Sequence, residues 1–432
     1  MQTDVLIIGA GAAGLATAYE LVKAGKKVTV LEARNRIGGR IHTIQTNKGH
    51  MELGAEFVHG DLPITLGLLQ EAGLRYAQSG GKLFTVKNGH LTAGGDFIID
   101  WDLLEEKMNA LDRDMSLDAF LHTYFPGDAY TQLRFSVRRY AGGYDTADPA
   151  IASTLALRDE WMKESGRQYR IATGYGSLLD YLAGKIKAAG GEILLGTPVK
   201  KLQWAAGQAH ALCDNGLTYS AAKAVITLPL AILQQNGPNG LFRFSPALPE
   251  KTAAARQMGM GAIIKLLLQF KEAFWQDTPY RSMGFIMSDE TIPTWWTQYP
   301  EELPVLTGWL GGPPAEAYRD APGEQLLQMA IQSLSNIFHI PQDTLYEWLE
   351  DAQVLNWTAM HYTRGSYAYA TIHTHTALPI LMEPVQHTLY FAGEALYEGP
   401  AMGTVEAAFT SGMEAAKQLL TQAAAPPANQ PQ

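Results

Sequence analysis

A strand, a glycine-rich loop, a helix and a second strand follow one another within the first 32 residues. The run VLII at 5–8 is apolar throughout, which is typical of a buried parallel strand. It leads into GAGAAG at 9–14, which opens an expected amphipathic helix that stops at Gly25. A second strand, 27–31, ends at Glu32. This order predicts an α/β fold with a Rossmann-like dinucleotide-binding unit.

The residues of this loop are candidates for cofactor binding, and each glycine has its own role. Gly9 permits the tight turn, Gly11 lets a pyrophosphate approach the backbone, and Gly14 lets the helix pack on the strand. The N-terminus of the helix suits an anion, and Glu32 is placed to accept hydrogen bonds from ribose hydroxyls. The candidates are Gly9, Gly11, Ala13, Gly14 and Glu32.

The segment ARNRIGGR at 33–40 points to a larger cofactor than a nicotinamide dinucleotide. Paired glycines between arginines suit a second pass of the backbone beside a diphosphate, and an arginine there can donate paired hydrogen bonds to phosphate. The alternative is a basic surface loop. The candidates are Ala33, Arg34, Gly39 and Arg40.

Residues 9–40 resemble the N-terminus of the flavin amine oxidases, a family that includes monoamine oxidases, polyamine oxidases and lysine-specific histone demethylases. The resemblance implies FAD as cofactor. LYFAGE at 389–394 and the segment from Gly399 resemble the family's C-terminal strand, loop and helix beside the flavin, although an ordinary packing helix would also fit. The implied cofactor-binding residues are Gly393, Glu394, Gly403 and Thr404.

Three internal segments extend the resemblance. ELGAEFVHG at 52–60 resembles a loop that passes beside the flavin in polyamine oxidases, with Phe57 at the usual tryptophan position. ATGYGSL at 172–178 is similar to a family turn that enters a helix, and GTPV at 196–199 to a strand whose valine meets the adenine. These segments add Gly54, Ala55, Glu56 and Val199 to the implied cofactor site.

The same resemblance implies two interleaved domains, with a pocket where they meet over the flavin ring. We assign 1–75, 171–250 and 354–422 to a discontinuous FAD-binding domain of Rossmann type. We assign 76–170 and 251–353 to an α+β substrate domain, and 423–432 to a disordered tail. The stretches 70–170 and 277–353 resemble nothing specific and are expected to be rich in helix.

Lys265 is a single charge in the strand-like run GAIIKLLLQF at 261–270. Taken alone, it is best explained as a side chain that reaches solvent. The run, however, resembles the family strand whose lysine hydrogen-bonds a water at flavin N5. In that setting Lys265 is a catalytic candidate that relays protons through the water.

Three further residues are candidates for the reaction site. RGSY at 364–367 is the family's form close to the flavin, and Tyr367 matches the first of two tyrosines that frame the amine in monoamine oxidases. The second falls on Thr404, as in histone demethylases. Trp357 either frames the substrate or packs. Ser366 stands where monoamine oxidases couple a cysteine to flavin, so FAD is expected to be noncovalent.

The resemblance implies an FAD-dependent amine oxidase. A hydride leaves the amine α-carbon for flavin N5, the imine hydrolyses to an aldehyde, and O2 reoxidises the flavin with release of H2O2. The incomplete tyrosine pair favours a polyamine or an N-substituted amine. Candidate substrate-binding residues are Glu56, His59 and Tyr367.

Other functions share this N-terminal fingerprint. An L-amino-acid oxidase would use an arginine where Glu56 and Phe57 stand. A carotenoid- or protoporphyrinogen-type flavin desaturase or oxidase would not need a proton-relaying lysine. A non-catalytic flavin scaffold or a demethylase-like peptide binder are further alternatives.

Composition narrows the partners and the compartment. The net charge of −10 argues against nucleic acid, which needs a basic face. Cys213 is the single cysteine, so neither an intramolecular disulfide nor a cysteine-rich metal site is expected. No signal peptide is recognisable before Val5, and no apolar run approaches the roughly 20 residues that span a bilayer. We expect a cytoplasmic enzyme with a small amine and O2 as partners, no metal, no membrane anchor and a homodimer as one option.

Overall fold

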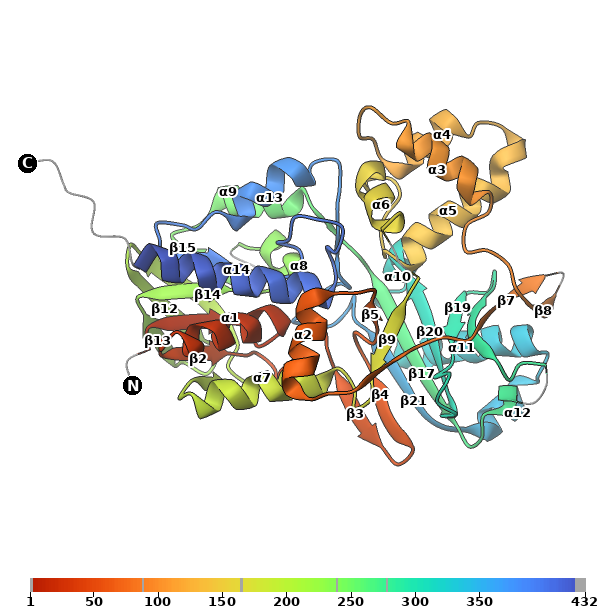
Figure 1. The fold of residues 1–432 in the computed structure, drawn as a ribbon, viewed down its shortest axis with the longest axis horizontal. Helices are drawn as coiled ribbons and strands as arrows, with labels where there is room; N and C mark the ends of the chain where they lie inside the picture. Colours follow the sequence, from red (N-terminus) through yellow and green to blue (C-terminus); the bar gives the residue numbers. More distant parts are fainter. Residues whose placement is uncertain (1–2, 88, 164–165, 238–239, 277–278, 424–432) are drawn as a thin grey trace, which may run out of the picture.

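The structure is a computed structural model that describes residues 3–87, 89–163, 166–237, 240–276 and 279–423. Figure 1 shows two bodies of sheet, one on each side of the molecule, and a group of helices above the second. A parallel sheet flanked by helices forms the first body, and a mixed sheet forms the second. The predicted α/β class, with a Rossmann-like unit and an α+β part, is confirmed.

The first body contains a five-stranded parallel sheet with the order β10-β2-β1-β14-β23. Val5 lies opposite Val28 on one side and Lys223 on the other. All residues of β1 and β2 are buried, as expected for strands covered on both faces. Side chains alternate, so that Ile7 faces one core and Ile8 another. The strands are β1 (Val5–Ile8), β2 (Val28–Leu31), β10 (Glu192–Leu194), β14 (Lys223–Ile226) and β23 (Leu389–Phe391).

Helix α1 is buried almost all round, so the expectation of an amphipathic helix is wrong. The reason is that α14 and α7 both pack against it. The hydroxyl of Thr17 donates to the carbonyl oxygens of Ala13 and Gly412. A Cβ at Gly412 would lie 2.3 Å from the Ala13 oxygen, so this close approach requires glycine. The helices on this face are α1 (Ala12–Lys23), α2 (Pro63–Ala72), α7 (Gly176–Ala188) and α14 (Val405–Ala423).

A second, four-stranded sheet and three helices share a core with the other face of the parallel sheet. The strand order is β13-β12-β11-β15. Leu202 of β11 and Leu378 of α13 belong to the same buried cluster as Leu6 of β1. These elements are β11 (Val199–Ala205), β12 (Gln208–Cys213), β13 (Thr218–Ala221), β15 (Arg243–Ser245), α8 (Leu230–Gln234), α9 (Pro249–Arg256) and α13 (Thr374–Met382).

The second body is a seven-stranded mixed sheet with the order β21-β17-β20-β19-β18-β7-β8. Its strand β17 is buried along its whole length. The expectation that 70–170 and 277–353 are rich in helix is confirmed, and both stretches also contribute strands. These short strands form because of burial and pairing with other strands, which the local sequence pattern does not record. The strands are β7 (Lys82–Lys87), β8 (His90–Ala93), β17 (Ile263–Phe270), β18 (Met283–Met287), β19 (Thr294–Trp296), β20 (Val305–Gly311) and β21 (Leu349–Asn356).

Helices accompany this sheet, and α3 to α6 form the group above it in Figure 1, whereas α11 and α12 lie beside its strands. The helices are α3 (Trp101–Asn109), α4 (Leu117–Tyr124), α5 (Thr131–Gly143), α6 (Thr154–Trp161), α10 (Gly312–Ala317), α11 (Gly323–Phe338) and α12 (Gln342–Trp348). Short strands link the two bodies, and β5 and β6 both pair with β9. They are β3 (Thr43–Thr46), β4 (Gly49–Glu52), β5 (Val58–His59), β6 (Tyr76–Gln78), β9 (Gln168–Ile171), β16 (Gly259–Met260) and β22 (Ala368–Tyr369).

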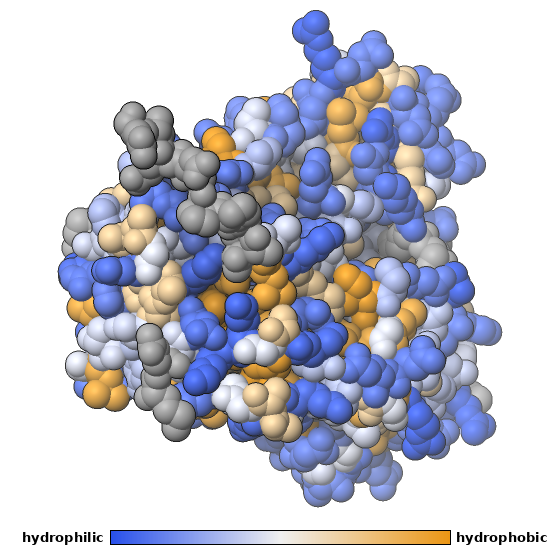
Figure 2. Space-filling model, turned by 60° about the vertical axis from the view of Figure 1, so that its left-hand side comes forward, coloured by the Kyte–Doolittle hydropathy of each residue, from blue (hydrophilic) through white to orange (hydrophobic). Residues whose placement is uncertain are grey.

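The proposed FAD-binding pieces 1–75, 171–250 and 354–422 supply every strand of the parallel sheet. Strand β21 crosses the proposed boundary at 353/354 and pairs with β17. Of the proposed tail, Ala423 ends α14, and 424–432 lie outside the described residues. On the face drawn in Figure 2, hydrophilic residues cover most of the periphery and hydrophobic ones gather near the middle. Among the described residues, no helix combines the length and hydropathy needed to cross a bilayer.

Candidate active site

A cavity of about 1190 Å³ lies between the parallel sheet and the seven-stranded sheet. It brings together residues from both ends and the middle of the chain. Of the predicted site residues, Gly14 alone does not line it. Those that do are Gly9, Gly11, Ala13, Glu32, Ala33, Arg34, Gly39, Arg40, Gly54, Ala55, Glu56, His59, Val199, Lys265, Trp357, Tyr367, Gly393, Glu394, Gly403 and Thr404.

The glycine loop shapes the nucleotide end of the cavity. A Cβ at Gly14 would lie 2.0 Å from the carbonyl oxygen of Gly9, so this glycine serves helix–strand packing. Gly11 begins α1 and has open space around its Cα, since the one neighbour of an added Cβ is 4.0 Å away. No side chain caps α1, so its first N–H groups are open to an anionic ligand.

Glu32 lies at the end of β2, with its carboxylate held in place by the backbone. One oxygen accepts from the N–H of Ala10 at 2.8 Å and the other from the N–H of Arg34 at 2.9 Å. Each carboxylate oxygen can accept a second hydrogen bond. The arrangement therefore fits the ribose hydroxyls of a dinucleotide.

The arginines after Glu32 have different partners. Arg34 donates to Thr363 Oγ1 at 2.6 Å. Arg36, which the motif reading did not single out, donates to backbone carbonyls of its own turn at Ile37, Gly39 and Ile41. Arg36 therefore shapes the turn that places its neighbours.

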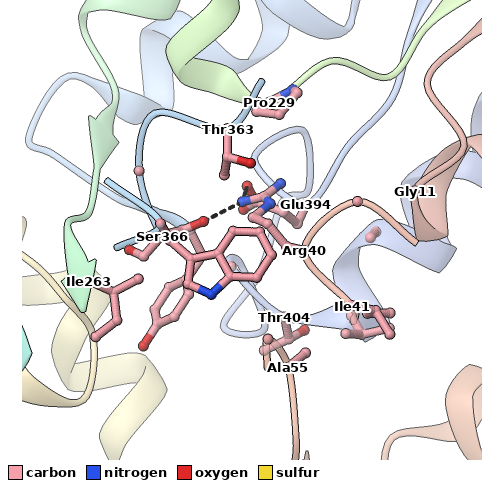
Figure 3. Close-up of a pocket in the computed structure, with 18 of the residues that line it drawn as sticks. Gly11, Arg40, Ile41, Ala55, Pro229, Ile263, Thr363, Ser366, Glu394 and Thr404 are labelled. Atoms are coloured by element: carbon pink, nitrogen blue, oxygen red, sulfur yellow. Dashed lines mark hydrogen bonds and ion pairs between the residues drawn. The ribbon is translucent and has the colours of Figure 1, made fainter. Parts of the chain in front are cut away.

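Arg40 joins the N-terminal and C-terminal motifs. Its Nη1 lies 2.6 Å from Glu394 Oε1 and 2.7 Å from the carbonyl oxygen of Ser366. Figure 3 shows Arg40 and Glu394 between the loop that carries Gly11 and the segment that carries Ser366. The open Gly11 backbone, the fixed Glu32 carboxylate and this ion pair fit FAD along one wall of the cavity.

Lys265 is 1% exposed, so the interpretation of a solvent-reaching side chain is wrong. Strand β17 carries it in the seven-stranded sheet, and its side chain lines the cavity. Nζ donates to Glu56 Oε2 at 2.9 Å and to the carbonyl oxygen of Gly54 at 3.0 Å. It also lies 5.5 Å from the centroid of the Trp296 ring.

Glu56 is the centre of a buried charged cluster. Its Oε1 accepts from Arg170 Nε at 3.0 Å and from Trp296 Nε1 at 2.9 Å. Burial would raise the pKa of Glu56, but Lys265 and Arg170 outweigh burial and lower the pKa to about 2. The carboxylate is thus ionised and paired, and the structure does not offer it as a free partner for a substrate ammonium.

The ring of Tyr367 packs against Gly403, the residue before Thr404. A Cβ added at Gly403 would lie 3.1 Å from that ring. The hydroxyl of Tyr367 donates to the carbonyl oxygen of Tyr144, and burial raises the pKa of Tyr367 well above its ordinary value. Thr404 Oγ1 donates to the carbonyl oxygen of Ala401 at 2.7 Å and accepts from a backbone N–H of α14 at 3.2 Å. Thr404 therefore caps α14 as well as lining the cavity.

Trp357 and His59 also line the cavity, each with a fixed orientation. The indole N–H of Trp357 donates to the carbonyl oxygen of Leu53 at 2.9 Å, and its ring would meet a Cβ at Gly54. Trp357 thus packs and lines the site at once. His59 Nδ1 lies 3.3 Å from the hydroxyl of Tyr144, and the two rings meet edge to face.

Sequence reasoning missed an aromatic wall and the cation behind it. Phe57 lies 5.8 Å from Trp296, and Trp296 lies 5.6 Å from Trp309, measured between ring centroids. Arg170 stacks on Phe57 at 4.6 Å. Phe57 lies in the family-like loop at 52–60, but the other residues come from stretches without a family motif, where the tryptophan-rich run at 294–296 was the available signal.

Comparison with known proteins gives one family. The model "Flavin containing amine oxidoreductase" matches residues 12–127 and 101–420. Lysine-specific histone demethylase 1B of Mus musculus is 27% identical over 453 residues, which cover 96% of this chain and 52% of the relative. The chain thus spans about half the length of that relative. Polyamine oxidase 2 of Arabidopsis thaliana is 26% identical over 450 residues, which cover 96% of this chain and 87% of the relative.

Two solved structures share the fold over almost the whole chain. Wild-type putrescine oxidase bound to putrescine superposes with a TM-score of 0.81 at 21% identity, covering 98% of this chain and 99% of that one. Cyclohexylamine oxidase from Brevibacterium oxydans gives a TM-score of 0.79 at 21% identity, covering 98% and 100%.

Proposed function

The chain belongs to the flavin containing amine oxidoreductase family, and from this premise we propose that it is an FAD-dependent amine oxidase. Its cofactor is FAD, as the resemblance implied. We further propose that FAD is held without a covalent bond. Ser366 stands at the linking position, and its hydroxyl is engaged with Thr146 Oγ1 at 2.6 Å.

One observation carries the proposal: a buried lysine and an aromatic wall face the same cavity as the dinucleotide loop. When bound, FAD supplies the acceptor for a hydride from the amine α-carbon, and dioxygen is the proposed final oxidant, released as H2O2. The rings of Tyr367, Trp296 and Phe57 are suited to bind the amine and exclude water. Lys265 is proposed to hold the water that relays a proton, and the imine product then hydrolyses to an aldehyde.

The proposed substrate is an amine with an apolar N-substituent. Thr404 leaves more room than a second tyrosine would, and the aromatic wall suits an apolar group. The likeness to a polyamine oxidase and a putrescine oxidase supports a polyamine instead. Against this, the Glu56 carboxylate is already paired with two cations.

An L-amino-acid oxidase gains no support from Arg170. The N–H groups of Arg170 donate to Glu56 and to the carbonyl oxygens of Thr297 and Tyr299, so Arg170 is not placed to bind a substrate carboxylate. O2 as acceptor, a cytoplasmic location and a homodimer remain parts of the proposal.

Anaerobic bleaching of the flavin tests the reaction class. Secondary amines such as N-methylbenzylamine should reduce the flavin, and admission of O2 should return the colour with one H2O2 per turnover. Bleaching by L-amino acids alone, or by no amine at all, would overturn the proposal. Within the amines, a higher kcat/KM for benzylamine or spermidine than for N-methylbenzylamine would overturn the substrate assignment alone.

A further inference from the structure

We propose that Glu56 and Arg170 are positioning residues that fix Lys265 as an ammonium with one donor aimed into the cavity. The inference rests on the proposed function, because it concerns the lysine assigned to proton relay. It gives Glu56 a different role from the cofactor or substrate contact expected from its loop.

The three side chains come from three separate segments. Lys265 lies in β17, Glu56 lies in the loop between β4 and β5, and Arg170 lies in β9. Lys265 Nζ and Arg170 Nη2 each lie 2.9 Å from an oxygen of the same carboxylate. The side chains of Lys265 and Glu56 are 1% and 4% exposed. A buried ammonium is tolerated when a counter-ion and hydrogen bonds satisfy it, and Glu56 supplies the counter-ion.

The far side of the cluster prevents the carboxylate from rotating. Arg170 is anchored by the carbonyl oxygens of Thr297 at 3.0 Å and Tyr299 at 3.1 Å. Arg170 and the indole N–H of Trp296 both hold Oε1 of Glu56. The other oxygen, Oε2, is therefore directed at Lys265.

The consequence for Lys265 is a fixed donor count. An ammonium has three N–H donors, and the described residues engage two of them, through Glu56 and the Gly54 carbonyl. One donor is left for a water or ligand in the cavity that Lys265 lines. The trio carries two positive charges against one negative, and of its two cations Lys265 is the one that lines that space.

The test is a double-mutant cycle read by thermal unfolding and by anaerobic flavin reduction. The variants are Glu56→Gln, Lys265→Met, the double variant and Glu56→Asp. Glu406→Gln is the matched control, because Glu406 is also a buried carboxylate but accepts from the backbone and hydroxyl of α2. Unfolding is followed from pH 6 to pH 10. Glu52 and His50 also act electrostatically on this cluster, so each pair of variants is compared at the same pH.

Lys265→Met should lower Tm in the wild-type background and raise it in the Glu56→Gln background, where it removes an ammonium without its counter-ion. The same effect of Lys265→Met in both backgrounds would overturn the ion pair. This readout needs no amine turnover, so it stands even if no amine reduces the flavin.

Flavin reduction tests positioning. Glu56→Gln should slow reduction by an amine about 10²-fold at pH 7, and its rate should depend on pH differently from wild type. Glu56→Asp should recover part of the rate, and Glu406→Gln should stay near wild type. Coupling in Tm without a change in the reduction rate would show a merely structural pair and overturn the positioning role. A wild-type protein whose flavin no amine reduces would overturn the proposed function instead.

Discussion

Arg40 and Glu394 are 354 residues apart in the chain and form an ion pair at 2.6 Å. Glu394 also accepts from the backbone N–H of Ala368 at 3.2 Å, and Arg40 reaches the Ser366 carbonyl. The pair therefore fastens the glycine-rich N-terminal segment to both C-terminal segments around the cavity. We therefore expect a substitution that weakens this ion pair to weaken the binding of FAD.

Arg40→Lys is expected to weaken FAD retention by about 10-fold. Lysine keeps the charge, but its shorter, flexible side chain does not hold a donor in the fixed position from which Arg40 Nη1 donates to both Glu394 and the Ser366 carbonyl. Release of flavin fluorescence on dilution measures the effect. Arg158→Lys is the control, since Arg158 pairs with the neighbouring Asp159 at the surface. Equal retention in Arg40→Lys and Arg158→Lys would contradict the fastening role.

Glu52→Gln is expected to change how stability depends on pH. Burial raises the pKa of Glu52 to about 7, against its ordinary value of 4.5, although hydrogen bonds from Tyr175 N–H and the Thr43 hydroxyl oppose the shift. A carboxyl with a raised pKa in the fold takes up a proton on folding between these values, so the wild type loses stability as pH rises from 4.5 to 7. The loss amounts to about 3 kcal/mol at most.

Glutamine stays neutral, so Glu52→Gln should gain stability relative to wild type as pH rises and level off above pH 7. Tm values at pH 5, 6, 7 and 8 check this. The control Glu406→Gln should show no such trend from this cause. A difference between Glu52→Gln and wild type that is constant across this range would be incompatible with the raised pKa.

The dinucleotide loop could be predicted from the sequence because the residues that form it follow one another in the chain. Strand, glycines, helix and Glu32 lie within 32 residues, and the structure places Gly9, Gly11 and Glu32 along one cavity. The family resemblance then located Lys265, Tyr367 and Thr404, which also line it. Short motifs with fixed spacing carry this information locally.

The charged cluster and the aromatic wall could not be read in this way. Arg170 stands 114 residues from Glu56, and Trp296 stands 240 residues from it. Their contacts depend on how β9 pairs with the distant strand β5 and on how β19 is placed in the seven-stranded sheet, and no local period records either. The same limit explains why Lys265 alone suggested a solvent-reaching side chain although β17 is buried on both faces.

Thr404→Val should distinguish the two roles of Thr404, which caps α14 and also lines the cavity. Valine keeps the shape but removes the hydroxyl that accepts from Ala407 N–H at the start of α14, which should cost about 1 kcal/mol of the free energy of unfolding. Thr404→Ser keeps the hydroxyl and should stay near wild type in Tm. If Thr404→Ser melts below wild type while Thr404→Val keeps the wild-type Tm, the methyl group rather than the cap stabilises this end.

Lys265→Met removes the ammonium while keeping a side chain of similar length. Turnover of an amine should fall by about 10²–10⁴-fold, the range for loss of a positioned proton relay. If Lys265 reached solvent, as its sequence context alone suggested, Lys265→Met would leave the free energy of unfolding unchanged. Because Lys265 is paired in the structure, Lys265→Met should lower the free energy of unfolding, since Glu56 loses one of its two cations. Arg170 and Trp296 still hold the carboxylate, so the cost should stay near or below about 3 kcal/mol.

Rapid mixing under anaerobic conditions gives the rate of flavin reduction by Lys265→Met, and mixing the reduced protein with O2 gives reoxidation. The flavin content of the purified variant is measured first, so that a slow rate can be separated from lost cofactor. Lys271→Met is a suitable control, because Lys271 follows β17 and is exposed. Half-reactions of Lys265→Met that match those of Lys271→Met, with full FAD content, would show that the buried ammonium serves the fold and takes no part in the reaction.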